Sequence, residues 1–448
     1  MKAIMLDKEE LKSSGIEWIG EIPQHWHTEN IKYHFDVIAG ATPDSKNPEY
    51  WDGDITWVTP ADYRTEDKYV KCGKRSLSLA GYQACSASLT PKGSIIFSKR
   101  APIGTVALST TELCTNQGCL ACVPKASVNS TYYYYVMSIA TEEFELKGAG
   151  TTFKEISANN FLNTKLPCLG CEEQQVIANY LDDRCSKIDA IIAEAKASIE
   201  EYQELKQAVI YEAVTKGINH TQCKHIDIDY LDDMPVNWHI SSIGLLFQFI
   251  GGYAYKSDRF IVDSNFQVIR IGNVKDNNLV LERNPVFISA EYATESNNAQ
   301  IQVDDILFTM TGTKGKGDYF YTLIIKENDL VNKKLFVNQR VGCFRKSNSN
   351  IYMAYYNYLL KMPKIREYVF LFETGTANQG NIGIEVLNRI KLYCPPYDEQ
   401  VKIVDYLDNK TERIDNLISE KQSLIEDLES YKKSLIYEVV TGKRKVVA

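Results

Sequence analysis

One stretch of this chain occurs twice, and that duplication restricts the possible folds more than any other feature. Residues 173–215 and 399–441 align without a gap at a constant offset of 226, so that Tyr180 corresponds to Tyr406 and Ile188 to Ile414. In both copies apolar residues recur every three or four positions, which is the spacing of a helix with one apolar stripe. The duplication therefore predicts two long helices of the same kind.

The apolar stripes of these two helices need a partner. No Pro or Gly interrupts either run before Gly217 and Gly442, where we expect the helices to end. At 1.5 Å per residue each helix would be roughly 65 Å long, which is longer than the diameter of one globular core. We therefore expect the helices to pack on each other as an antiparallel coiled coil, since two unrelated amphipathic helices would not explain the repeat. The predicted seam consists of Ile188, Ile191, Ile192, Ala195, Ile199, Tyr202, Leu205 and Val209, and of Ile414, Leu417, Ile418, Leu424, Ile425, Leu428, Tyr431 and Leu435.

A mixed segment precedes each helix, at residues 15–165 and 226–391, and the two segments contain similar runs in the same order. Trp26 matches Trp238 and Gly40 matches Gly252, at offsets that drift between 211 and 226 because surface loops differ in length. Short β-type runs interleaved with helical ones predict two α/β (α+β) heads. The expected domains are a first head (1–165), a first long helix (166–219), a second head (220–391) and a second long helix (392–448).

Each head also contains an aromatic run, at residues 132–135 and 355–358. Tyrosines at helical spacing are usually half-buried core residues and less often platforms on which nucleic-acid bases stack. We therefore assign both runs to the cores.

The distribution of charge matters more than the net charge of −8. Residues 172–216 hold ten acids and five bases, and residues 398–442 hold eleven and six, so the two helices carry −10 and the rest about +2. The heads are thus free to face phosphate. No run of eighteen apolar residues and no signal-peptide core occurs, so we expect a cytoplasmic protein without membrane contact.

Eleven cysteines in such a chain are expected to be reduced. Two Cys-x-x-Cys pairs, Cys119/Cys122 and Cys168/Cys171, raise the possibility of zinc. The second copy does not keep them, and the usual spacing of structural zinc ligands is missing. We therefore expect no metal.

Catalysis by the chain itself finds little support in the sequence. Cys394-Pro-Pro-Tyr397 is similar to an adenine-methyltransferase motif, but a cysteine cannot replace its amide or carboxylate, and the prolines suit a helix start. Asp44 with Glu66 and Lys68 fits a loose nuclease pattern that the second head lacks. The glycine-rich run 312–317 lacks the ending of a P-loop. No nucleophile–base constellation can be proposed.

Several motifs resemble the specificity subunit of type I restriction–modification enzymes. They are EWIGEIPQHW at 17–26, AGTTFKEIS at 149–157, LPCLGCEEQ at 166–174, TGTANQGNI at 374–382 and LYCPPYDEQ at 392–400. The order head–helix–head–helix is also similar. Two departures are Leu169-Gly170 in place of a proline, and residues 227–233 in place of a second WIGE element.

The resemblance implies a non-catalytic subunit in which each head reads one half of a bipartite, asymmetric site in double-stranded DNA. The helix pair would set the spacer and bind two methyltransferase subunits, with restriction subunits added for cleavage. S-adenosylmethionine, ATP and magnesium would belong to those partners, and none to this chain. A coiled-coil scaffold that binds only proteins remains the alternative.

Residues that could touch DNA are cations, amides and hydroxyls in the loops of the heads, because such groups reach base edges and phosphates. Those retained in both heads suggest a shared structural or phosphate role, whereas those that differ suit sequence choice. Thr151, Thr152, Lys154, Thr374 and Thr376 are expected at the junctions of head and helix. The candidates in the first head are Tyr63, Arg64, Lys99, Arg100, Asn116, Gln117, Thr151, Thr152 and Lys154. Those in the second head are Arg270, Lys275, Lys314, Lys316, Asn338, Gln339, Arg340, Thr374 and Thr376.

Overall fold

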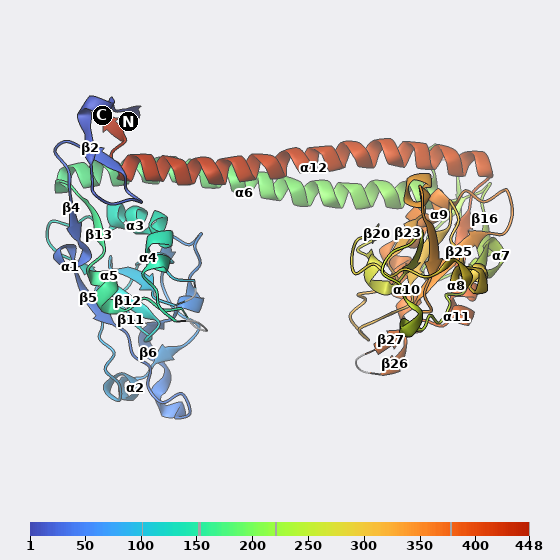
Figure 1. Cartoon of the computed structure of the whole chain (residues 1–448), viewed down its shortest axis with the longest axis horizontal. Coiled ribbons are helices and arrows are strands. Elements are labelled where there is room, and N and C mark those ends of the chain that lie inside the picture. Colours follow the sequence, from blue (N-terminus) through green and yellow to red (C-terminus); the bar gives the residue numbers. More distant parts are fainter. Residues whose placement is uncertain (101, 151–153, 220–221, 377–378, 448) are drawn as a thin grey trace. The chain divides into compact units, whose positions relative to one another are not determined.

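The computed structural model describes residues 1–100, 102–150, 154–219, 222–376 and 379–447 (Figure 1). The chain forms two compact units: unit 1 comprises Met1–Ala197 with Lys421–Ala448, and unit 2 comprises Ser198–Glu420. Each unit therefore contains one head and part of both long helices. No helix in the described ranges is long and apolar enough to cross a membrane.

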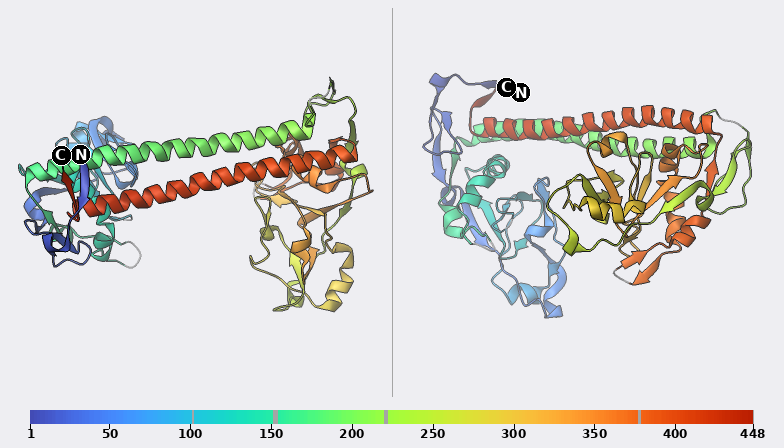
Figure 2. Two further views of the ribbon diagram at one scale, coloured as in Figure 1. Left: turned by 90° about the horizontal axis from the view of Figure 1, so that it is seen from above. Right: turned by 45° about the vertical axis from the view of Figure 1, so that its right-hand side comes forward.

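The two long helices are α6 (Cys171–Lys216) and α12 (Tyr397–Val440), which lie side by side in Figures 1 and 2. Gly217 and Gly442 follow them with φ of 74° and 75°, a left-handed conformation that glycine adopts without strain at a helix C-terminus. The prediction of where the helices end is thus confirmed. The two prolines before Tyr397 lie between strand β28 (Lys391–Cys394) and the first turn of α12.

Ion pairs between α6 and α12 give their direction. In unit 1, Lys432 Nζ lies 2.6 Å from Asp189 Oδ1, and in unit 2, Lys206 Nζ lies 2.7 Å from Asp415 Oδ1. The step forward from Asp189 to Lys206 along α6 is matched by an equal step back from Lys432 to Asp415 along α12. The helices are therefore antiparallel, as predicted for a coiled coil. The two pairs are also equivalent under the 226-residue offset.

Only part of the predicted seam is covered by the partner helix. Ile188, Ile192, Ala195, Ile414, Ile425 and Leu435 are buried. By contrast Ile191, Leu205, Leu417, Leu424 and Tyr431 are between 39% and 51% exposed. The expectation that all of these residues lie in one seam is therefore wrong, because one antiparallel partner covers a narrower stripe than the apolar positions span.

The head of unit 1 is built on a five-stranded sheet in the order β5-β12-β9-β10-β7, with a three-stranded sheet β11-β6-β8 beside it. In the larger sheet β7 and β10 are parallel and the other pairs are antiparallel. The helices α3 (Ser130–Ile139), α4 (Thr141–Leu146) and α5 (Ala158–Leu162) follow the last of these strands. The strand bounds are β5 (Phe35–Ala39), β6 (Trp51–Val58), β7 (Tyr69–Val70), β8 (Ser76–Leu77), β9 (Ile95–Ser98), β10 (Val106–Ser109), β11 (Cys114–Thr115) and β12 (Cys119–Pro124).

The head of unit 2 repeats this plan with a four-stranded sheet in the order β17-β25-β21-β23. A parallel pair, β18 and β24, takes the place of β6 and β11. The helices α9 (Met353–Leu360), α10 (Pro363–Phe370) and α11 (Ile384–Arg389) follow. The strand bounds are β17 (Phe247–Ile250), β18 (Phe266–Ile269), β21 (Ile306–Thr309), β23 (Thr322–Ile324), β24 (Lys334–Val337) and β25 (Val341–Lys346).

Smaller pairs connect each head to its helices. Strand β4 (His27–Asn30) pairs with β13 (Lys165–Cys168), and β16 (His239–Ser242) pairs with β28, just before α6 and α12 begin. The first and last strands of the chain, β1 (Lys2–Met5) and β29 (Arg444–Val447), form an antiparallel pair. The internal repeat of the sequence is therefore a repeat of structure.

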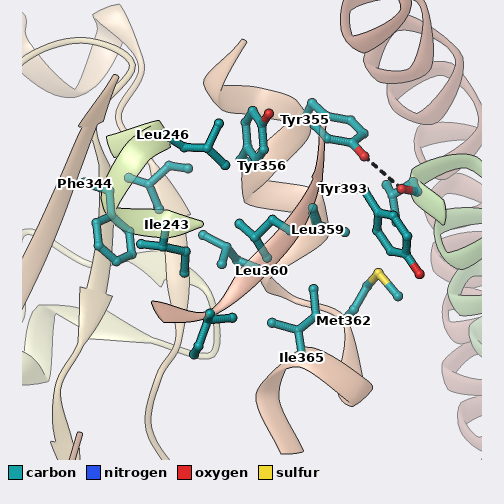
Figure 3. Close-up of a cluster of buried hydrophobic side chains, with 14 of the residues drawn as sticks. Ile243, Leu246, Phe344, Tyr355, Tyr356, Leu359, Leu360, Met362, Ile365 and Tyr393 are labelled. Atoms are coloured by element: carbon teal, nitrogen blue, oxygen red, sulfur yellow. Dashed lines mark hydrogen bonds between the residues drawn. The ribbon is translucent and has the colours of Figure 1, made fainter. Parts of the chain in front are cut away.

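Both aromatic runs lie in the cores, as predicted. Tyr132 donates a hydrogen bond to Val440 O at the end of α12, and Tyr355 donates one to Val214 O at the end of α6. Figure 3 shows Tyr355 and Tyr356 among Leu359, Leu360 and other buried side chains, with the bond from Tyr355 drawn as a dashed line. Each tyrosine thus anchors its head to the last turn of one long helix.

A buried glutamine near the start of each long helix provides a second anchor. Gln400 Oε1 accepts from Tyr352 N, which precedes α9, while its Nε2 donates to Pro395 O and Asn350 O. Gln174 makes the same three bonds with Asn129 N, Leu169 O and Ser127 O in unit 1. In each unit this side chain therefore ties the start of the long helix to the loop that precedes α3 or α9.

Replacing Gln400 by alanine is expected to destabilise unit 2 by about 2 kcal/mol, because three backbone groups lose a buried partner. The measurement is hydrogen exchange at the first turn of α9, together with thermal unfolding of the full chain. Gln422→Ala, at an exposed position of the same helix, is the control. Equal exchange in both variants would contradict the anchoring role.

Candidate nucleic-acid interface

The predicted polar positions lie where two parallel strands end. In unit 1, Val58 of β6 pairs with Thr115 of β11, so that Thr59 and Asn116 follow together. In unit 2, Ile269 pairs with Val337, so that Arg270 and Asn338 occupy the corresponding positions. Because these strands are parallel, the residues that follow them lie at one edge.

At this edge unit 2 has an open cavity of about 460 Å³. Four predicted residues line it, Arg270, Asn338, Gln339 and Arg340. Its remaining lining residues are Ile271, Gly272, Asn273, Arg283 and Asn284. Three arginines around one hollow make it a candidate site for an electronegative ligand.

Asn273 builds this cavity without adding charge. Its Oδ1 accepts from Arg270 N at 3.0 Å, and its Nδ2 donates to Val280 O at 2.9 Å and to Arg283 O at 2.8 Å. The guanidinium Nη2 of Arg270 donates to Asn284 O at 2.7 Å. These bonds bring Arg283 beside Arg270. Arg283 was not predicted from the sequence, because nothing in its neighbourhood indicates that Asn273 holds it there.

Unit 1 has the same scaffold with different side chains. Asp62 takes the place of Asn273, accepting from Thr59 N at 2.8 Å and from Lys74 N at 2.9 Å. Thr59 stands where unit 2 has Arg270, and Gly118 stands where it has Arg340. An acidic group therefore occupies the corresponding site of unit 1.

The side chains of the Asn-Gln pair make structural contacts in unit 1. Asn116 Oδ1 accepts from Gly118 N at 2.9 Å, and Thr42 bonds to the side chain of Gln117. The backbone N–H of Asn116 donates to Val58 O, and that of Asn338 donates to Ile269 O. These bonds tie the loop to the neighbouring parallel strand in each unit.

A second group of predicted residues lies on an exposed hairpin of unit 2. Strands β26 (Thr374–Thr376), β27 (Gln379–Asn381) and β22 (Thr311–Gly312) form one small sheet, and Lys314 Nζ donates to Gly375 O at 3.0 Å. Lys316 is exposed in the same loop. This sheet lies at the edge of the unit away from α12 (Figure 1). The predicted position of Thr374 and Thr376 at a head–helix junction is therefore wrong, because their strand β26 pairs with β27, which in turn pairs with β22.

The predicted loop after β9 holds two cations that share one carboxylate. Glu155 Oε1 lies 2.9 Å from Lys99 Nζ, and its Oε2 lies 2.8 Å from Arg100 Nε. The bond from Lys99, followed by that from Arg100, lowers the pKa of Glu155 below its usual value. Lys154 is exposed beside this group. Thr151 and Thr152 lie outside the described residues.

Tyr63 is not available to DNA. It is 3% exposed, packs against Val58 and Val70, and its phenol lies 3.6 Å from Cys119 Sγ. Burial raises its pKa well above the ordinary value. Its selection as a base-reading residue was wrong, because it points into the core.

The residues next to this core position are exposed. Arg64 follows Tyr63 and lies 3.7 Å from Glu66. Lys275 follows Val274, which is the buried counterpart of Tyr63, and lies 3.9 Å from Asp276. Both pairs are solvent-exposed and contribute little energy, so the two cations are available to a ligand.

Potential metal ligands come together once in the described part of the chain, at His27, Glu29 and Cys168. His27 Nε2 lies 3.2 Å from Glu29, and burial, followed by Glu29, raises the pKa of Cys168 to about 11. The Cys168 thiol also donates to Glu29 Oε2 at 3.7 Å, so the three groups contact one another through this carboxylate. Cys119 and Cys122 are three apart in strand β12 and so face opposite sides of it.

Comparison with known sequences gives a family match in both halves of the chain. The profile of the family described as "Type I restriction modification DNA specificity domain" matches residues 23–201 and again residues 235–427. The chain belongs to this family. Each match covers one head and part of the helix that follows it.

Relatives of this specificity-domain family include the type I restriction enzyme MjaIX specificity subunit of Methanocaldococcus jannaschii. It is 34% identical over 234 residues, which are 50% of this chain and 52% of that protein. The chain spans about half the length of the curated relatives it matches.

Two solved structures share the fold. One comes from a study of complex assembly and conformational transition of the type I R-M system, with a TM-score of 0.72, 15% identity, and coverage of 94% of this chain and 99% of that chain. The other is the HsdS subunit from Thermoanaerobacter tengcongensis, with a TM-score of 0.54, 16% identity, and coverage of 94% and 98%. At these identities the likeness concerns the fold alone.

Proposed function

We propose that this chain is the DNA sequence-recognition subunit of a type I restriction–modification complex and has no catalytic activity of its own. The observation that carries the proposal is that the DNA specificity domain occurs twice, on one scaffold with different side chains at the same edge. Two such heads, each reading one half of an asymmetric duplex site, would gain effective concentration from their linkage.

The helices supply the proposed spacer and the surface for two methyltransferase subunits. In unit 1, Ile191 and Tyr431 are 46% and 51% exposed, and in unit 2 the equivalent positions Leu417 and Leu205 are 39% and 49% exposed. Exposed apolar residues at matching places suit two copies of one partner. Restriction subunits would join for cleavage, and S-adenosylmethionine, ATP and magnesium would be bound by these partners.

Exchange of one head tests this proposal. Residues 15–165 are replaced by the corresponding head of another family member, and methylated adenines are mapped in cells that also express the methyltransferase subunit. One half of the methylated sequence should change while the other half and the spacer remain. If both halves changed, the heads would not read independently.

The alternative, a scaffold that binds only proteins, is distinguished by DNA retention. The complex should retain duplex DNA of the methylated sequence and lose it progressively as salt rises, because phosphate contacts release counterions. A complex that contains both methyltransferase subunits but retains no specific DNA would favour the scaffold.

A further inference from the structure

We infer, given the proposed function, that the arginine-lined cavity of unit 2 reads guanine in one half of the DNA site, and that unit 1 reads its half without this contact. The reading side chains are Arg270, Arg283 and Arg340. The inference adds a base preference, and the head responsible for it, to the general role proposed above.

The chemistry of the lining favours guanine. None of the three arginines forms an ion pair with another described residue. Guanidinium groups are donors only, and guanine presents two acceptors, N7 and O6, in the major groove. Adenine and cytosine present a donor there, which a guanidinium cannot accept. The three guanidinium groups, none of them in an ion pair, therefore favour the base edge that presents two acceptors, whereas thymine presents only one.

Arg270 is the best placed of the three. Its Nη2 donates to Asn284 O at 2.7 Å, and Asn284 is held in a turn with φ of 47°. Its Nη1 makes no hydrogen bond within the described residues and its Nη2 has a second N–H, so these two nitrogens can form a bidentate pair. The side chain is half-buried, which lowers the entropy that it loses on binding.

The comparison of the two units argues for base contacts rather than phosphate contacts. A phosphate contact serves any sequence, and the retained Asn-Gln pair shows what the two heads keep in common. Base contacts must differ when half-sites differ. The positions of Arg270 and Arg340 differ in this way, since unit 1 has Thr59 and Gly118 there, with Asp62 beside them.

The test is selection of duplex DNA from a randomised library by the full chain in complex with its methyltransferase subunits. The variants are Arg270→Thr and Arg340→Gly, which insert the residues of unit 1, and Arg283→Ala. Arg270→Lys keeps the charge but loses the bidentate geometry. It replaces Arg270→Thr in the experiment if the threonine variant does not fold. Arg389→Ala is the matched control, an exposed arginine of the same unit outside the cavity.

The wild-type complex should recover a bipartite sequence with guanine in one half. Arg270→Thr should reduce the preference for one guanine by about 5- to 100-fold and leave the other half unchanged. Arg389→Ala should recover the wild-type sequence. Equal loss of binding to every sequence in the cavity variants, with the recovered sequence unchanged, would mean phosphate contact and overturn the inference. Failure of the wild type to recover any sequence would instead overturn the proposed function.

Discussion

Replacing Asp305 by alanine is expected to destabilise unit 2 by about 3–5 kcal/mol. Asp305 is 1% exposed just before β21, and its carboxylate accepts from Arg345 Nε at 2.9 Å, from Arg345 Nη2 at 2.6 Å and from Gln302 N at 2.8 Å. The hydrogen bonds from Arg345 to Asp305 also raise the pKa of the guanidinium. Without the carboxylate, the half-buried Arg345 would lose its charged partner and keep only its bond to Gln300 O, and the N–H of Gln302 would lose its acceptor.

The measurement is chemical unfolding of the full chain, with hydrogen exchange in β21 and β25 to assign the change to unit 2. Lys346→Ala is the control, because it removes the exposed pair with Asp304 and should cost less than about 1 kcal/mol. Arg345→Met in addition to Asp305→Ala should recover part of the loss. Equal effects of Asp305→Ala and Lys346→Ala would show that the buried pair adds nothing.

Replacing Gly252 by alanine is expected to destabilise unit 2 by about 3 kcal/mol and to deform the arginine-lined cavity. A Cβ at this position would lie 2.1 Å from Asn338 O, a backbone atom that cannot move alone. Asn338 lines the cavity, so the substitution displaces the loop that carries Arg340. Gly40 has the same relation to Asn116 O in unit 1, also at 2.1 Å.

Gly251→Ala, one residue earlier, provides the matched control, since its Cβ would meet only Phe249 at 3.6 Å. The stability of both variants is measured by thermal unfolding and their DNA selectivity by the library selection described above. Gly252→Ala should lose both properties, whereas Gly251→Ala should keep them. If the two variants behaved alike, the close packing of Gly252, which follows β17, against the Asn338 loop would not support the site.

The predictions made from the sequence are confirmed where they depended on patterns among residues close together in the chain. The long helices, their ends at Gly217 and Gly442, the main strands and the aromatic runs of the cores all follow from periodicity and from glycine. The duplication added the pairing of the helices, because two matched apolar stripes need each other. The exposed positions Ile191 and Leu205 show the limit of this prediction, since periodicity does not indicate how much of an apolar stripe the partner helix covers.

The site residues were predicted less well because their environment depends on partners far away in the chain. Lys99 and Arg100 appeared free in the sequence, but both pair with Glu155 from more than fifty residues away. Tyr63 appeared to be a loop residue, but it fills the core beside Cys119. Arg270 and Arg340 were identified by type alone, without their connection to Arg283.

Sequence by itself determined the architecture of this protein. Helix periodicity and helix-ending glycines are local features of the chain, and the internal repeat can be recognised from its constant offset. Tertiary structure alone decided which cations are free, since ion pairs and burial arise between residues that the chain brings together only on folding. The arginine-lined cavity belongs to this second class. It exists because the side chain of Asn273 bonds to two backbone segments at once and places Arg283 beside Arg270.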